Sequence, residues 1–178
     1  MKMPTFSDDN IAFVHIFKTG GSSITKWYKE HVNINILNKH YNHYCLSVVE
    51  NPASISFTVI RNPWDRVVSM YFNICRNFPN FDIIFDNYVL YDMKTTLVGG
   101  KPLSTPQIRW SEQVTHVLRF ENIDKDFKII QDIFQCYEPL YKPTQINHDH
   151  YRTYYNDETR RAVAEMFKED IEAFGYEF

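Results

Sequence analysis

Short apolar runs alternate with amphipathic stretches along the 178 residues of the chain. The runs at 11–17, 55–60 and 117–120 are rich in aliphatic, β-branched and aromatic residues, and 32–37 alternates apolar with polar residues. Runs of this length and composition predict four strands.

Helices are predicted after these runs. The first covers about 22–31, and another begins at "NPWD", where Asn62 is a favourable N-cap and Pro63 suits the first helical position. Apolar residues also recur at helical spacing in "FDIIFDNYV", in "DFKIIQDIF" and in the C-terminal "ETRRAVAEMFKEDIEAFGYEF". The alternation predicts an α/β fold with a mostly parallel central sheet flanked by helices, and ligands at the carboxyl ends of the strands.

Length and composition narrow the protein class. The length predicts one domain, residues 1–178. The formal net charge of −3 gives no basic surplus for nucleic acid or anionic membranes, and no apolar run approaches the ~20 residues that span a bilayer. The three cysteines, Cys45, Cys75 and Cys136, are odd in number and form no CxxC pair. They argue against a disulfide framework and a structural zinc site, and they favour a reducing cytoplasm.

The stretch "FVHIFKTGGSSITKW" at 13–27 joins the first predicted strand to the first predicted helix. Gly20 and Gly21 would let the backbone approach a ligand closely, and the helix adds unpaired N–H groups and a positive dipole end. The side chains that could contact an anion here are Lys18, Thr19, Ser22 and Ser23. The stretch predicts a phosphate-binding loop, and a plain strand-to-helix turn is the alternative. The GxxxxGK[ST] loop of kinases differs, because its lysine follows the glycines.

A second strand-to-helix junction lies in "VIRNPWDRVVSMYF". Arg61 leaves the strand end and Ser69 follows eight residues later, about two helical turns in, so both could face one anion. Arg66 could reach the same ligand or pair with a neighbouring acid. Two phosphate sites on adjacent units suggest a nucleotide with phosphates at both ends.

At these segments the sequence resembles the sulfotransferases that use 3′-phosphoadenosine 5′-phosphosulfate (PAPS), in particular the carbohydrate (heparan-sulfate-type) O-sulfotransferases. The family patterns "FVHIPKTGGTS" and "RNPxxRxxSxY" correspond to "FVHIFKTGGSS" and "RNPWDRVVSMY". The resemblance continues through "TPQ", "VLRFENI" and the C-terminal residues 146–178. Phe17 departs from the pattern, because the family usually has Pro there.

The resemblance implies a P-loop-like, three-layer α/β fold and a division of the nucleotide between the two motifs. The residues that would wrap the 5′-phosphosulfate are Lys18, Thr19, Gly20, Gly21, Ser22 and Ser23. Arg61 and Ser69 would hold the 3′-phosphate. PAPS would be the sulfate donor, released as adenosine 3′,5′-bisphosphate (PAP), with no metal.

A general base for the acceptor proton is expected in "NKHYNHYCLSVV". The resemblance implies a catalytic histidine just after the second strand, and His40 fits this position, with His43 as runner-up. His15, inside the first strand, is expected to be structural. The histidines lack the Cys or carboxylate spacing of a zinc site.

The acceptor is predicted to be a carbohydrate hydroxyl, with a small or terminal glycoside preferred because the chain is short. Polar and aromatic loop residues suit sugars, and the candidates are Gln107, Arg109, His148, His150, Tyr151, Arg152, Tyr154 and Tyr155. The segment "YRTYY" could instead only anchor the last helix. Two other classes stay open: a magnesium-dependent, P-loop kinase-like phosphotransferase, and a nucleotide-binding module without catalysis.

Overall fold

The computed structural model describes residues 11–32, 40–42, 55–80, 82–98, 101–141 and 148–178, and of 40–42 it describes the backbone. Two compact units are distinguished within the chain. The first consists of Met1–Ile60 with Trp110–Thr144, and the second of Arg61–Arg109 with Gln145–Phe178.

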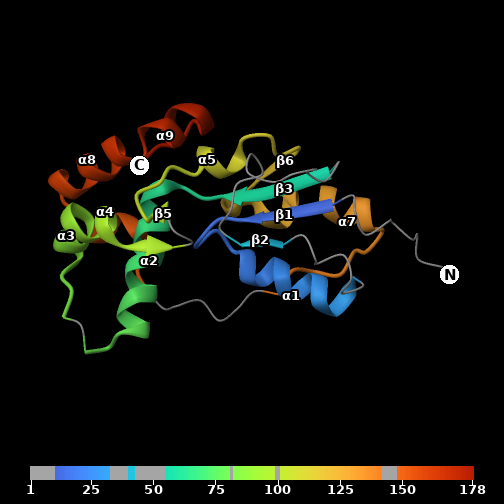
Figure 1. The fold of residues 1–178 in the computed structure, drawn as a ribbon, viewed down its shortest axis with the longest axis horizontal. Helices are drawn as coiled ribbons and strands as arrows, with labels where there is room; N and C mark the ends of the chain where they lie inside the picture. Colours follow the sequence, from blue (N-terminus) through green and yellow to red (C-terminus); the bar gives the residue numbers. More distant parts are fainter. Residues whose placement is uncertain (1–10, 33–39, 43–54, 81, 99–100, 142–147) are drawn as a thin grey trace. The chain divides into compact units, whose positions relative to one another are not determined.

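The first unit contains a parallel sheet (Figure 1). Within the described residues its strands are β1 (Ile11–His15), β2 (His40–Asn42), β3 (Ile55–Ile60) and β6 (His116–Arg119), in the order β2-β1-β3-β6. All three pairings are parallel. This arrangement confirms the predicted α/β class and the strands at the two apolar runs that became β1 and β3.

The strand β2 lies beyond the run that the sequence predicts as the second strand. The alternating run at 32–37 falls almost entirely outside the described residues, and the strand that pairs with β1 is His40–Asn42. Phe13 lies opposite His40, and His15 lies opposite Asn42. His40 is the first residue of β2, and the prediction that it follows a strand at 32–37 falls on residues that are mostly outside the description.

One face of the sheet is covered by α1 (Gly21–His31) and α7 (Lys128–Phe134). The rings of Phe13 and Phe57 stack with centroids 4.8 Å apart, and Trp27 packs edge-on against Phe127. The Trp27 indole N–H donates to the carbonyl oxygen of Glu138 over 2.7 Å. Burial of these aromatic side chains between the helices and the sheet stabilises this unit.

The second unit begins directly after β3 with α2 (Pro63–Asn77). The Asn62 side chain accepts hydrogen bonds from the backbone N–H groups of Trp64 (3.0 Å) and Asp65 (3.4 Å). This confirms the predicted N-cap and satisfies two N–H groups that the helix itself leaves unpaired.

Short elements follow in both units. In the second unit they are α3 (Phe85–Asn87), the π-helix η3 (Tyr88–Asp92), α4 (Met93–Thr95) and the antiparallel pair β4 (Leu97–Val98) and β5 (Lys101–Pro102). The chain continues through α5 (Ile108–Ser111), and after β6 come η4 (Phe120–Asn122) and α6 (Ile123–Asp126) of the first unit. The helix predicted from "FDIIFDNYV" is thus three short helical segments that start at Phe85.

The C-terminal region, predicted as one amphipathic helix, contains a break. After η5 (Tyr151–Tyr154) come α8 (Asp157–Met166) and α9 (Lys168–Phe174), separated at Phe167. The Asn156 side chain accepts from the Thr159 N–H and starts α8 with a capping box. No helix among the described residues combines the length and the apolar character needed to cross a membrane.

Candidate functional site

The loop after β1 contains two left-handed residues. Lys18 has φ 66° and Gly20, the N-cap of α1, has φ 91°. Glycine adopts this conformation without steric cost, whereas lysine does so at a cost of about 1–2 kcal/mol. The Ser23 N–H donates to the Gly20 carbonyl and tightens the start of the helix. A strained residue at a helix N-terminus suggests a functional constraint on the loop.

Position 21 requires glycine because His15 leaves no room for a side chain there, and not because of the backbone conformation. A Cβ atom at this position would lie 2.0 Å from Cδ2 of His15, so any larger residue would overlap the imidazole ring. His15 in turn stacks on Phe13 with centroids 5.6 Å apart. His15 therefore packs beneath the loop, which agrees with its predicted structural role.

The loop side chains differ in what they can offer a ligand. Thr19 is buried, and its hydroxyl donates to the Ile16 carbonyl over 2.9 Å. The sequence had predicted a hydroxyl donor here, but this hydroxyl stabilises the loop, so contact with an anion would come from the Thr19 backbone. Ser22 is exposed, and Lys18 and Ser23 are partly exposed. The first turn of α1 has no acidic side chain, which favours an anion at this end.

Arg61 is held on both its side chain and its backbone. Its Nε donates to Oδ2 of Asp65 over 2.8 Å. Its N–H donates to the Gln107 side-chain oxygen (2.9 Å), and its carbonyl accepts from the Gln107 side-chain nitrogen (2.8 Å). Arg61 and Ser69 are both buried, with 8% and 7% of their surface exposed. The guanidinium and the hydroxyl predicted to bind phosphate thus belong to one unit.

Arg66 lies in the interior of the second unit. Burial lowers its pKa to about 10, and the nearby Asp170 carboxylate and Tyr88 partly offset this effect. The guanidinium also lies over the ring of Phe167, 5.7 Å from its centroid. The electrostatic interaction with Asp170 is consistent with the acid-pairing alternative, and contact with a nucleotide stays a prediction.

The histidines predicted to supply the base are only partly described. His40 is described by its backbone at the start of β2, and His43 lies outside the described residues. Asn42, opposite His15, ends the strand at the edge where β1 leads into the Lys18 loop. His43 is the next residue in the sequence, whereas His40 lies two residues before this edge.

Several residues suggested for the acceptor have structural contacts. Gln107 is fully buried, so it is not part of an open pocket. The Tyr155 hydroxyl donates to the Trp64 carbonyl over 2.9 Å, which supports the anchoring alternative for this tyrosine. His148 stacks on Phe72 with centroids 5.1 Å apart. In the part of the chain that the structure describes, no group of three or more His, Cys, Asp or Glu side chains could hold a metal.

The comparisons with known proteins match these observations. The model of the sulfotransferase family matches residues 2–122, which include both the Lys18 loop and the Arg61 motif. The chain belongs to the sulfotransferase family. Membership confirms the predicted enzyme class, a PAPS-dependent sulfotransferase. No match was found among the curated proteins that were searched.

Solved structures of other sulfotransferases resemble this one. A mouse sulfotransferase complexed with PAP is 14% identical over 93% of this chain and 84% of that chain, with a TM-score of 0.60. An Arabidopsis thaliana sulphotransferase is 12% identical over 97% of this chain and 79% of that chain, with a TM-score of 0.48. The match to the mouse enzyme shows the fold and confirms the P-loop-like α/β architecture.

Proposed function

We propose that this sulfotransferase acts as a single domain spanning residues 1–178 and moves the sulfuryl group of PAPS to a carbohydrate hydroxyl, releasing PAP. The observation that carries the proposal is the loop between β1 and α1. Lys18 and Gly20 adopt left-handed conformations there, at the N-terminus of a helix without acidic residues in its first turn. Backbone N–H groups, a cation and a helix dipole together suit a phosphosulfate.

The loop would bind the 5′ end of the donor. Lys18 supplies a positive charge, Ser22 and Ser23 supply hydroxyls, and Thr19, Gly20 and Gly21 supply backbone N–H groups. Negative charge on the 5′-phosphate grows as the bond from sulfur to the phosphate oxygen breaks. A lysine at this position therefore stabilises the transition state more than the ground state.

Arg61 and Ser69 would bind the 3′-phosphate. A guanidinium has five N–H donors in a fixed plane, and the Arg61 Nε donates to Asp65. Phosphate oxygens accept such donors in a bidentate arrangement. Together with the loop, these residues would supply protein donors for both ends of the nucleotide, and its binding would need no metal ion.

A histidine from the β2 segment would take the proton of the acceptor hydroxyl while that oxygen bonds to sulfur. His40 is the first candidate because the resemblance to the carbohydrate branch assigns the base to this point. His43 gains support from the register of β2, since it follows Asn42 at the carboxyl edge of the strand.

The carbohydrate acceptor rests on the same resemblance and on the polar and aromatic residues around 148–155. A small or terminal glycoside is the preferred acceptor within this class. The cytoplasm remains the proposed location, because Cys75 and Cys136, the cysteines among the described residues, are both thiols.

Thermal unfolding with added nucleotides tests the proposal. PAP should raise the melting temperature without metal, because it binds the native state through both motifs. A kinase-like protein would instead respond to ATP with magnesium and not to PAP, which would reject the proposal. A binding module would respond to PAP but would transfer no labelled sulfate from PAPS to glycosides.

A further inference from the structure

Gln107 forms a pair of hydrogen bonds with the backbone of Arg61. Its side-chain oxygen accepts from the Arg61 N–H at 2.9 Å, and its side-chain nitrogen donates to the Arg61 carbonyl at 2.8 Å. A primary amide has the same donor and acceptor as a peptide group. The Gln107 amide therefore pairs with the Arg61 backbone as a neighbouring peptide group would in a sheet. The two hydrogen bonds fix the peptide groups on both sides of the Arg61 Cα atom.

Gln107 is itself held by Asp170 of α9. Oδ2 of Asp170 accepts from the Gln107 backbone N–H at 2.8 Å and from its side-chain nitrogen at 3.3 Å. Oδ1 accepts from the Ile108 N–H at 2.8 Å. Asp170 and Gln107 are both fully buried. The carboxylate thus fixes the backbone and the amide plane of Gln107 at once.

The charges around Asp170 fit this role. Burial raises the pKa of its carboxyl group, and the hydrogen bonds from Gln107 and Ile108 and the positive charge of Arg66 oppose that rise. A buried carboxylate is tolerated only where donors and a cation compensate its desolvation. The three donors and Arg66 provide part of this compensation, and they connect α9 with the start of α2.

These contacts control the position of a single cation. Asp65 fixes the Arg61 guanidinium through Nε, and Gln107 fixes the backbone from which that side chain extends. Bidentate recognition of a phosphate requires its donors to be placed within about 0.5 Å. A shift of the Arg61 backbone would therefore weaken contact with a 3′-phosphate and leave the 5′ end of a nucleotide unaffected.

We propose that Gln107 and Asp170 are positioning residues for Arg61 and thereby set the preference for nucleotides that carry a 3′-phosphate. This inference rests on the proposed function, in which Arg61 binds that phosphate. Neither residue would touch the nucleotide. The effect of substituting them should appear in the discrimination between nucleotides rather than in binding as a whole.

The measured quantity is the ratio of the dissociation constants of adenosine 5′-monophosphate and PAP, obtained by calorimetry on the full chain. Gln107→Met keeps the side-chain length and removes both hydrogen bonds to Arg61. It should reduce the ratio by about tenfold through weaker binding of PAP. Asp170→Asn keeps the shape, removes the charge and replaces one accepting oxygen with an NH2 donor. It should change the ratio in the same direction by a smaller factor.

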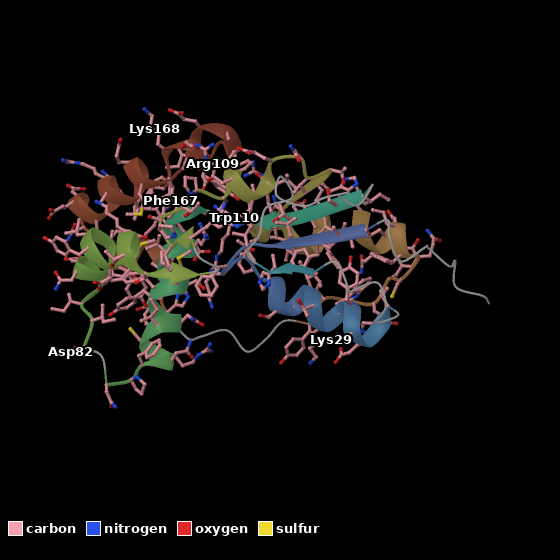
Figure 2. The ribbon with its side chains drawn as sticks, viewed as in Figure 1. Lys29, Asp82, Arg109, Trp110, Phe167 and Lys168 are labelled. Carbon is pink, nitrogen blue, oxygen red and sulfur yellow. The ribbon has the colours of Figure 1, made fainter. Side chains whose placement is uncertain are left out.

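Glu169→Gln is the matched control. Glu169 precedes Asp170 and forms an exposed ion pair of 2.8 Å with Arg109, so it links the same two segments without contacting Arg61. Figure 2 labels Arg109 and Lys168, which flank these contacts in the sequence. The control should leave the ratio unchanged within about twofold, as expected for an exposed pair.

A double substitution separates positioning from simple stability. In an Arg61→Ala background, Gln107→Met should cause no further change in the ratio, because the group that it positions is gone. If Gln107→Met lowers the melting temperature and weakens both nucleotides equally, Gln107 only stabilises the fold and the inference is wrong. If Gln107→Met does not fold, Asp170→Asn decides by the same criterion.

The failure of the inference differs from the failure of the proposed function. A wild-type chain that shows no preference for PAP would reject the proposed function, and the inference with it. A preference that depends on Arg61 but survives both Gln107→Met and Asp170→Asn would reject the inference alone.

Discussion

Arg61 and Asp65 form an ion pair in which Nε of the arginine donates to Oδ2 of the aspartate over 2.8 Å. The pair spans one helical turn, from the residue before the N-cap of α2 to its first turn. The side chains are 10% and 20% exposed, so water screens the pair less than an exposed one. An anion at Arg61 would meet a guanidinium that is already oriented but partly neutralised.

Substitutions at Asp65 separate its orienting effect on the Arg61 guanidinium from its neutralising effect. Asp65→Asn keeps an oxygen acceptor for Nε and removes a charge that repels phosphate, so PAP should bind at least as tightly as to the wild type. Asp65→Ala also removes the acceptor and should bind PAP about three to ten times more weakly than the Asn variant. Calorimetry measures both affinities, and Arg61→Ala, with an expected loss of about 10- to 100-fold, sets the scale. Equal affinities of the Asn and Ala variants would show that orientation by Asp65 is unimportant.

Gly21→Ala should destabilise the protein by about 1–3 kcal/mol, because the new methyl group overlaps the His15 ring. Adding His15→Ala removes the obstructing ring. The double variant should therefore be more stable than the sum of the two single changes predicts. Urea unfolding of the four proteins measures this coupling. Additive effects would mean that the ring moves aside at no cost.

The histidine variants test the assignment of the base. His40→Ala should leave PAP affinity nearly intact and lower sulfate transfer by about 10²- to 10⁴-fold, the usual scale of general base catalysis. His43→Ala should cost less if His40 is the base. If the order is reversed, the base is His43. His31→Ala, at the end of α1, serves as the control and should transfer sulfate at the parental rate. Full activity of both variants would place the base outside this segment.

The raised pKa of Asp170 predicts a pH dependence of stability. Because the folded state binds this proton more tightly than the unfolded chain does, lowering the pH through the raised pKa toward the ordinary value of 3.8 stabilises the native state. The free energy of unfolding of the wild type should therefore rise, relative to Asp170→Asn, as the pH falls from 7 toward 4. Urea titrations at several pH values measure the difference. A difference that shrinks on acidification would mean that the hydrogen bonds outweigh burial and lower the pKa.

Features encoded by neighbouring residues were predicted well. The strand β3 covers the predicted residues 55–60, and Asn62 caps α2 as its sequence pattern indicates. The glycine loop was also located correctly between a strand and a helix. In each case the signal lies within a few residues and depends on backbone preferences rather than on distant contacts.

Features that depend on tertiary contacts were missed. The helix break at Phe167 is accompanied by burial of the Phe167 ring near Arg66. The sequence has no glycine or proline at the break that would have predicted it. Thr19 turns its hydroxyl inward to Ile16, which the pattern of a phosphate loop does not reveal. Gln107 and Asp170 meet across 63 positions of the sequence. The tripeptide "TPQ" of the family resemblance was the available signal for Gln107, which the sequence analysis instead assigns to the acceptor pocket.

The sheet order also bears on how the chain folds. Each parallel pairing joins distant residues, as when Phe57 lies opposite both Phe13 and His116. Such contacts close long loops before they gain stabilising energy, and domains dominated by them fold in milliseconds to seconds rather than microseconds. Newly synthesised chains would therefore expose the apolar edges of β1 and β3 until the segment that contains β6 has been made. We expect refolding to be slow, and truncation before His116 to leave an aggregation-prone product.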